Sequence, residues 1–272
     1  MVKLRIRHTK LGKVRFTSSR DAARIWERAL RRVALPVALS EGFTPRPKIS
    51  FGLALPTGAE SVAEYVDIDL RPDVRAADVD LDTLAERLSA ALPIGFDVVV
   101  AAVRPVGKGS LQDAVTACTW ELTHPRLTAD DHRRACALLS APTLVIERER
   151  KGKRSADDVR PLILDLRFAD RSASALLANP SEPQFAGCLV ADLSTVGRGL
   201  RPSELAELAY PGHDARDIRA LRTHQWVDAV DPNDQQRTNG PGGRREVLPL
   251  EEPAPDAAGP VGTDTSHEVV PA

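Results

Sequence analysis

The sequence is poor in aromatic residues, which make up 4% of its 272 residues, and it contains a single methionine. A core must therefore be built from leucine, valine, isoleucine and alanine. No stretch approaches the roughly 18 consecutive apolar residues that a membrane-spanning helix needs. The first ten residues alternate charged and apolar side chains and contain no apolar segment typical of a signal peptide. We therefore expect a cytoplasmic protein without a membrane partner.

Cysteine is equally scarce, and Cys118, Cys136 and Cys188 lie too far apart to form a C-x-x-C pair. This spacing excludes a zinc or iron–sulfur site built from cysteines alone. An odd number of cysteines without a disulfide framework is typical of a reducing compartment. The sequence also lacks the G-x-S-x-G, Walker, G-x-G-x-x-G and H-E-x-x-H motifs. We therefore expect no metal site and no cofactor, and no residue is identified as catalytic.

The formal net charge of −1 conceals an uneven distribution of charge along the chain. Residues 1–50 contain 13 Lys and Arg against 3 Asp and Glu, a surplus of 10 positive charges. Residues 231–272 contain 3 Arg against 8 Asp and Glu, an excess of 5 negative charges. This asymmetry indicates an anionic partner for the N-terminal region, or a tail that shields it.

The first part of the chain has the pattern of an α+β fold. Apolar and charged residues alternate from Val2 to His8 and from Glu64 to Leu70, which predicts half-buried strands. Ser18 is a suitable N-cap for a helix that must end before Pro36. Further elements are expected as extended chain at residues 14–17, strands at 49–51 and 96–103, and a helix at 81–92. The order β-α-β-β-α-β predicts a ferredoxin-like module over residues 1–107.

A similar but looser pattern follows and predicts a second α+β module of similar topology over residues 113–230. We expect strands at residues 115–123, 143–150 and 159–168 and helices at 128–139 and 202–209. Further extended segments are expected at 173–178 and 217–227. Residues 231–272 contain seven prolines, five glycines and no aromatic residue. Such a segment cannot bury enough apolar surface to offset its chain entropy, so we expect a disordered acidic tail.

The predicted first helix has a basic face, because Arg20, Arg24, Arg28 and Arg31 fall on one side of it at 100° per residue. Arginine binds phosphate through two parallel hydrogen bonds, so this face is a candidate anion-binding surface. Cations that precede the helix could extend the surface: Arg5, Arg7, Lys10, Lys13 and Arg15. The alternative interpretation is a solvated helix face whose arginines pair with carboxylates elsewhere.

The loop Gly42-Phe43-Thr44-Pro45-Arg46-Pro47-Lys48 directly follows the helix and is stiffened by its two prolines. A stiff loop loses little entropy on binding. Phe43 could stack on a base while Arg46 and Lys48 contact phosphates. The alternative is that Phe43 fills the core and that the prolines only shape the crossover.

A third basic segment, residues 148–154, resembles the tip of a β-hairpin and contains Lys151 and Lys153. It is either a contact for a nucleic-acid backbone or a solubilising turn. With the helix and the loop, it completes the predicted anion-binding set: Arg15, Arg20, Arg24, Arg28, Arg31, Phe43, Arg46, Lys48, Lys151 and Lys153.

Several strings in residues 3–70 resemble one family: RFTS at 15–18, RALRR at 28–32, GFTPRPKISF at 42–51 and LPTGAES at 55–61. This is the radical-SAM-associated domain family of unknown function, whose members occur as separate bacterial proteins or fused behind a radical SAM enzyme. The resemblance is looser through about residue 230 and does not cover the tail. It implies a radical SAM protein as a partner, and the chain itself lacks the C-x-x-x-C-x-x-C cluster motif. The family usually has histidine where this chain has Ser19, which argues against catalysis at the helix start.

Three hypotheses follow. The first is a non-catalytic accessory protein that works with a radical SAM enzyme and holds RNA or a ribonucleoprotein on its basic helix and loop. The second is an RNA-modifying enzyme that uses a carboxylate, such as Asp21 or Asp67, in a basic cleft. The third is an adaptor whose arginine face docks an acidic protein surface, with residues 251–268 of the tail as an internal mimic.

Overall fold

The computed structural model describes residues 2–104, 110–150, 152–170, 187–228 and 240–247. Its first half follows the predicted order of strand, helix, strand, strand, helix and strand. The elements are β1 (Lys3–Lys10), the 3-10 helix η1 (Gly12–Phe16), α1 (Ser19–Arg32), β2 (Ile49–Phe51), β3 (Glu60–Asp69), the 3-10 helix η2 (Ala76–Asp78), α2 (Leu81–Ala91) and β4 (Val98–Val103).

The prediction of extended chain at residues 14–17 is wrong, because the segment forms η1. Gly12 turns the chain with a φ of 64°, a left-handed conformation that favours glycine. Its backbone N–H donates to the Glu60 carboxylate at 2.7 Å, and Thr17 N–H closes the turn on the Val14 carbonyl at 2.9 Å. The side chain on β3 therefore fixes the position of η1.

Helix α1 begins and ends where the sequence predicts. The Ser18 hydroxyl accepts a hydrogen bond from the Asp21 N–H at 3.2 Å, which satisfies one of the free donors of the first turn. Trp26 and Leu30 are buried on the face that packs against the sheet. After the helix, Ala34 adopts a φ of 54° and the Leu35 N–H donates to the Leu30 carbonyl, so the chain leaves the helix just before Pro36.

The second half contains more elements than the sequence predicts. They are α3 (Leu111–Ala114), β5 (Val115–Thr123), α4 (Ala129–Cys136), the 3-10 helix η3 (Ala137–Ser140), β6 (Val145–Arg150), β7 (Lys153–Asp158), the 3-10 helix η4 (Arg160–Leu162), β8 (Ile163–Ala169), β9 (Cys188–Ser194), α6 (Pro202–Ala209), β10 (Arg219–Val227), the 3-10 helix η6 (Pro241–Gly243) and β11 (Arg245–Glu246). Strand β9 was not predicted. The extended segment expected at 173–178 lies outside the described residues.

Within the described residues, nine strands form one sheet in the order β4-β1-β3-β10-β5-β9-β8, with β2 on β3 and β11 on β10. In the first half, β4 pairs with β1, β1 with β3 and β3 with β2, all antiparallel. The second half repeats this arrangement, because β10 pairs with β5, β5 with β9 and β9 with β8. The β6–β7 hairpin is a separate sheet inserted before β8. The α+β class predicted from the sequence is confirmed.

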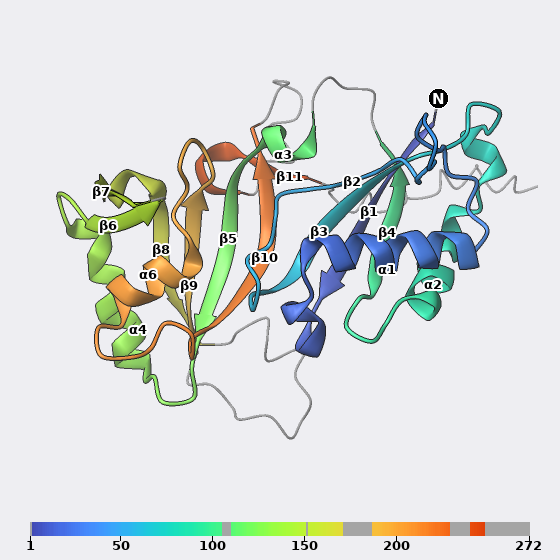
Figure 1. The fold of residues 1–272 in the computed structure, drawn as a ribbon. Coiled ribbons are helices and arrows are strands. Elements are labelled where there is room, and N and C mark those ends of the chain that lie inside the picture. The colour runs from blue at the N-terminus through green and yellow to red at the C-terminus, as the bar shows by residue number, and fades with distance from the viewer. Residues whose placement is uncertain (1, 105–109, 151, 171–186, 229–239, 248–272) are drawn as a thin grey trace, which may run out of the picture.

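The two halves meet where β3 and β10 run parallel for only two residue pairs, Glu60 with Leu221 and Ser61 with Arg222. Helices α1 and α2 cover the first half of the sheet, and α4 and α6 lie over the second (Figure 1). One buried apolar cluster lies within the first half, and the other fills the second half and also includes Leu55, Ala59, Ala63 and Tyr65 from the first. The segment between β2 and β3 runs past the meeting point of the halves (Figure 1).

Residues 240–247 belong to the fold, although the sequence analysis assigns them to a disordered tail. Strand β11 pairs with Trp226 and Val227 at the end of β10, and Val247 is buried. Gly240 lies so close to Trp226 that an added Cβ would be 2.5 Å from the indole ring. A composition-based argument does not detect a short segment held by a single aromatic contact and a strand pairing. Among the described residues, no helix is long and apolar enough to cross a membrane.

Candidate functional site

The outer face of α1 carries exposed arginines, as the sequence predicts. Arg24 and Arg31 form only loose ion pairs within the helix, with Asp21 at 3.5 Å and Glu27 at 3.7 Å. Exposed pairs of this kind contribute little to stability. Their guanidinium groups can therefore exchange these partners for an external anion at small cost.

The loop at residues 42–48 is fastened to the chain that precedes it. The Ser40 N–H donates to the Arg46 carbonyl at 2.8 Å, and the Arg46 N–H donates to the Ser40 hydroxyl at 3.0 Å. Leu39 and Pro47 form a β-bridge. At the tip, Phe43 is fully exposed. The alternative in which Phe43 fills the core is therefore wrong.

Helix α1 and this loop enclose a hollow of about 500 Å³, which we call the α1–loop groove. Arg24 and Arg31 line it from the helix and Arg46 lines it from the loop, together with Glu27. A neighbouring hollow of about 790 Å³ is lined by Arg31, Lys48 and other residues. The structure thus brings together five cations around the two hollows, Arg24, Arg31, Arg46, Lys48 and Arg71, which are up to 47 positions apart in sequence. Arg20 and Arg28 are exposed on α1 but line neither hollow.

The cations of β1 do not extend this surface, contrary to the prediction. Arg5 donates to the Asp67 carboxylate at 2.7 and 2.9 Å, and both side chains are largely buried. Arg7 pairs with Glu246 of β11 at 2.7 Å. Lys10 is buried and donates to the Thr17 carbonyl at 2.8 Å. The surplus of positive charge near the N-terminus is thus partly neutralised by acids that are distant in sequence.

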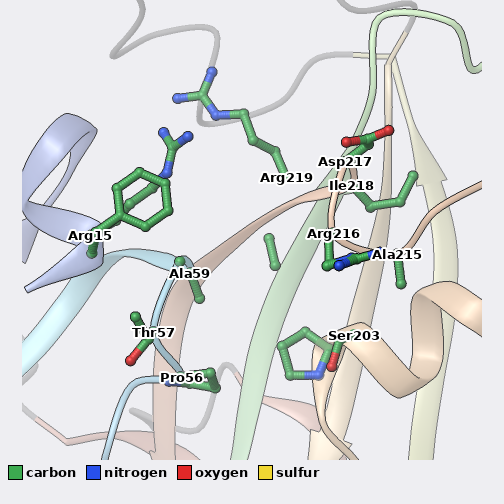
Figure 2. A pocket seen from close by; sticks show the side chains of 14 residues that line it. Arg15, Pro56, Thr57, Ala59, Ser203, Ala215, Arg216, Asp217, Ile218 and Arg219 are labelled. Carbon is green, nitrogen blue, oxygen red and sulfur yellow. The ribbon is translucent and has the colours of Figure 1, made fainter. Parts of the chain in front are cut away.

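Arg15 lies elsewhere, in a pocket of about 480 Å³ where the two halves meet, which we call the junction pocket. Figure 2 shows the side chains that line it, with Arg15 contributed by η1 and with Arg216 and Arg219 contributed by the chain around the start of β10. The buried Glu60 carboxylate accepts hydrogen bonds from Arg219 and has Arg15 3.6 Å away. The positive side chains of the junction pocket are therefore partly neutralised by Glu60 behind them and by Asp217, which lines the pocket.

The predicted hairpin contact is only partly described. Lys151 lies outside the described residues, and Lys153 is the first residue of β7. Arg148, from the same segment, is largely buried and pairs with Glu204 at 2.7 Å and Asp157 at 3.2 Å. This arginine fastens the hairpin to α6, so its positive charge is not available to a ligand.

The carboxylates proposed for an enzyme have structural partners. Asp67 pairs with Arg5 and with Arg104 at 3.5 Å, and Asp69 pairs with Lys3 at 3.0 Å. Asp21 is exposed in the first turn of α1 and accepts from the Ser18 hydroxyl. None of these acids faces either hollow beside the loop. The arrangement does not favour the hypothesis of a carboxylate catalyst.

Sequence analysis missed a row of buried polar residues across four adjacent strands. His8 on β1 lies opposite Glu64 on β3, and Glu64 accepts two hydrogen bonds from Arg222 on β10, at 2.5 and 3.2 Å. Beyond Arg222 lies Cys118 on β5, whose thiol pKa burial raises to about 11. Burial likewise lowers the pKa of His8. The signal was present in the alternation, because His8 and Glu64 occupy inward positions of their strands.

Metal ligation finds no support in the described part of the chain, where no group of three or more His, Cys, Asp or Glu could hold an ion. A comparison with curated proteins found no match. A comparison with protein families found a match over residues 3–187, which contain β1 to β8 and leave out β9, α6, β10 and β11. The match covers more than half of the sequence. The chain therefore belongs to the family described as an uncharacterized protein conserved in bacteria (DUF2344).

Proposed function

We propose that this protein binds single-stranded RNA, free or within a ribonucleoprotein, in the α1–loop groove and works as an accessory protein of a radical SAM enzyme. The observation that carries the proposal is the convergence of Arg24 and Arg31 from α1 with Arg46 from the loop around one hollow. Glu27 is the acid among its lining residues. A hollow with three arginines and one carboxylate attracts a polyanion.

The chemistry of the groove suits a nucleic-acid strand better than an isolated phosphate. Guanidinium groups bind phosphate oxygens through paired hydrogen bonds, and each neutralised phosphate releases counterions. Phe43 projects fully into solvent at the tip of the loop that supplies Arg46. An exposed aromatic ring beside a basic groove is the arrangement that single-strand binders use to stack bases. The hydrogen bonds between Ser40 and Arg46 hold the loop in place before binding.

The partner follows from the resemblance of residues 3–70 to radical-SAM-associated domains. The chain has no C-x-x-x-C-x-x-C motif, so the radical chemistry would belong to the partner. This protein would hold the RNA that the partner modifies.

The test is a binding titration by fluorescence anisotropy, with a labelled 12-nucleotide RNA of mixed sequence, between 50 and 200 mM salt. The change is the triple variant Arg24→Glu, Arg31→Glu and Arg46→Glu. Each phosphate contact to a single strand contributes about −0.7 to the slope of log K against log salt. Losing three contacts should therefore flatten the slope by about 2 and weaken binding at 50 mM salt by at least tenfold.

A matched control reverses three exposed arginines on other elements, Arg75, Arg133 and Arg134, and so changes the net charge equally. The control should reduce affinity only through the change in overall charge. Equal losses in the two triple variants would show that the groove is not a specific binding surface. Phe43→Ala should weaken binding about fivefold or more without changing the salt slope, because stacking contributes about 1–3 kcal/mol per base.

A second candidate function is protein docking through the same surface. Leu39 is 55% exposed beside the groove, and Phe43 adds a second exposed apolar side chain. Apolar anchors surrounded by arginine are typical of protein interfaces. Recovery of a radical SAM protein from cell lysate with and without ribonuclease separates the two functions. Ribonuclease-resistant recovery that the groove variant abolishes would favour docking over RNA binding.

A further inference from the structure

The row of buried polar residues borders a second internal space that the proposed RNA surface does not use. Arg222 and Cys118 lie at one side of a cavity of about 290 Å³, which we call the inner cavity. The coil at residues 53–56 and the turn before α6 form its other walls. The volume corresponds to about ten water molecules, which is close to the lower limit of small-molecule sites.

The walls of the inner cavity are mostly apolar. Leu53, Pro56, Trp120, Leu193 and Leu200 line it, and Trp120 also lies beneath the Arg222 guanidinium, 5.5 Å from ring centroid to Cζ. Gly199 lines the rim next to Ser194 and Thr195. Such a surface accommodates a hydrocarbon or aromatic body, and Arg201 adds a second cation to the lining.

Arg222 is the polar group at the base of this apolar space. It is completely buried, and its Nε and Nη2 are satisfied by Glu64 and by the Leu53 carbonyl at 2.8 Å. Its Nη1 is buried and has no hydrogen-bond partner among the described residues. An unsatisfied donor on a buried cation is costly, so Nη1 is a position where a ligand acceptor would be stabilised.

The charges around Arg222 define which acceptor fits. Lys10 and Arg222 are both buried cations, and Glu64 is the acid between them. His8 donates from Nδ1 to the Thr9 carbonyl at 2.9 Å, and burial lowers its pKa, so the ring is neutral. Two basic side chains thus share one carboxylate, so a negative charge beside Arg222 would be stabilised.

We propose that the inner cavity binds a small organic carboxylate, whose carboxylate accepts a hydrogen bond from Arg222 Nη1 and whose apolar body packs on Trp120 and Leu193. A carboxylate brings a negative charge to a cavity lined by two arginines, Arg222 and Arg201. The site is independent of the α1–loop groove, because the two share no lining residue. The proposed ligand would lie between the two halves of the protein.

The test is isothermal titration calorimetry on the full chain with three probes and their neutral amides: octanoate, 4-phenylbutanoate and indole-3-acetate. At least one carboxylate should bind about tenfold or more tightly than its amide, because a hydrogen bond to an ionised acceptor is roughly twice as strong as a neutral one. Quenching or enhancement of tryptophan fluorescence on binding would report contact with Trp120.

Two variants address the site from different sides. Arg222→Lys retains the charge beside Glu64 but loses the guanidinium fork, so the preference for carboxylate over amide should disappear. Gly199→Leu fills the cavity from its rim. An added Cβ there meets nothing closer than 3.5 Å, so this variant should fold and lose binding about tenfold or more. Arg5→Lys is the matched control, because Arg5 is another largely buried arginine, ion-paired with Asp67, that does not line the cavity.

Equal affinity for carboxylates and amides, or no binding of any probe to the unaltered protein, would overturn the proposal. Binding that survives Gly199→Leu would place the ligand elsewhere and also overturn it. If Arg222→Lys fails to fold, as judged by circular dichroism, the comparison of carboxylate with amide and the Gly199→Leu variant still decide. RNA binding should be unchanged in Gly199→Leu, so failure here is distinguishable from failure of the proposed RNA function.

Discussion

Glu60 should be the side chain whose loss most weakens the junction between the two halves. Its carboxylate is 2% exposed and accepts hydrogen bonds from the Gly12 N–H at 2.7 Å and from Arg219 at 2.9 and 2.8 Å. Arg15 lies 3.6 Å away. These partners belong to η1 and β10, so one carboxylate on β3 holds elements from both halves.

The substitution Glu60→Gln keeps the volume but removes the charge and turns an amide donor toward Arg219 or Gly12. Removing one member of a buried ion pair costs about 3–5 kcal/mol. The Arg219 and Arg15 side chains are 27% and 30% exposed, so water will solvate part of the charge that is left. We therefore expect a loss of about 2–3 kcal/mol in the free energy of unfolding. At about 2–4 °C per kcal/mol, Tm should fall by about 4–12 °C.

The assay is urea denaturation with calorimetry as a second readout. Glu149→Gln is the control, because Glu149 pairs with Arg154 at 3.7 Å in an exposed position and should change stability by less than about 0.5 kcal/mol. The double variant Glu60→Gln with Arg219→Gln should be more stable than the sum of the single effects by about 1 kcal/mol. A Glu60→Gln protein within about 0.5 kcal/mol of the unaltered chain would refute the reasoning.

Two further predictions concern other parts of the fold. Burial is the main cause that lowers the pKa of His224 from 6.5 to about 4. Between pH 6.5 and 4 the ring is therefore neutral in the folded protein, whereas the same ring in the unfolded chain binds a proton. Stability should therefore fall by about 3 kcal/mol as pH drops from about 6.5 to 4, and His224→Phe should flatten this part of the pH profile of urea unfolding. Gly95→Ala should destabilise the protein by at least about 2 kcal/mol more than Gly212→Ala, because both glycines have a φ near 100° but only at Gly95 would the added Cβ meet a carbonyl, that of Leu11 at 2.4 Å. Equal losses in the two alanine variants, measured by thermal unfolding, would show that the backbone conformation and not the contact sets the cost.

Local patterns predict local structure well in this chain. The N-cap Ser18, the apolar stripe of α1 and the proline that follows it together define a helix without tertiary information. The bounds of β5 and α6 agree with the sequence for the same reason, since each begins or ends at a recognisable signal. Strand β9 escaped prediction because six of its seven residues are buried, so polar and apolar side chains do not alternate with exposure.

Partners that are distant in sequence could not be predicted. The excess of positive charge near the N-terminus is visible in the composition, but its neutralisation depends on Asp67, Glu60 and Glu246, which lie up to 239 positions away from the arginines they pair with. Strand pairing in the sheet determines which cations form ion pairs within the fold and which stay available to a ligand. The arginines on the outer face of α1 stay available because no strand lies opposite that face.

The two similar halves are joined at the junction mainly by side chains. Strands β3 and β10 pair directly through only two residue pairs, which is too little to hold two sheets together by backbone hydrogen bonds. Across this seam, however, β3 supplies two acids, Glu60 and Glu64, and β10 supplies the two arginines that bind them, Arg219 and Arg222. Either half alone would bury or expose charges of one sign without their partners. The same pairing leaves the Nη1 atom of Arg222 without a hydrogen-bond partner among the described residues, and Arg222 lines the inner cavity, so the contacts that join the halves also shape the site proposed between them.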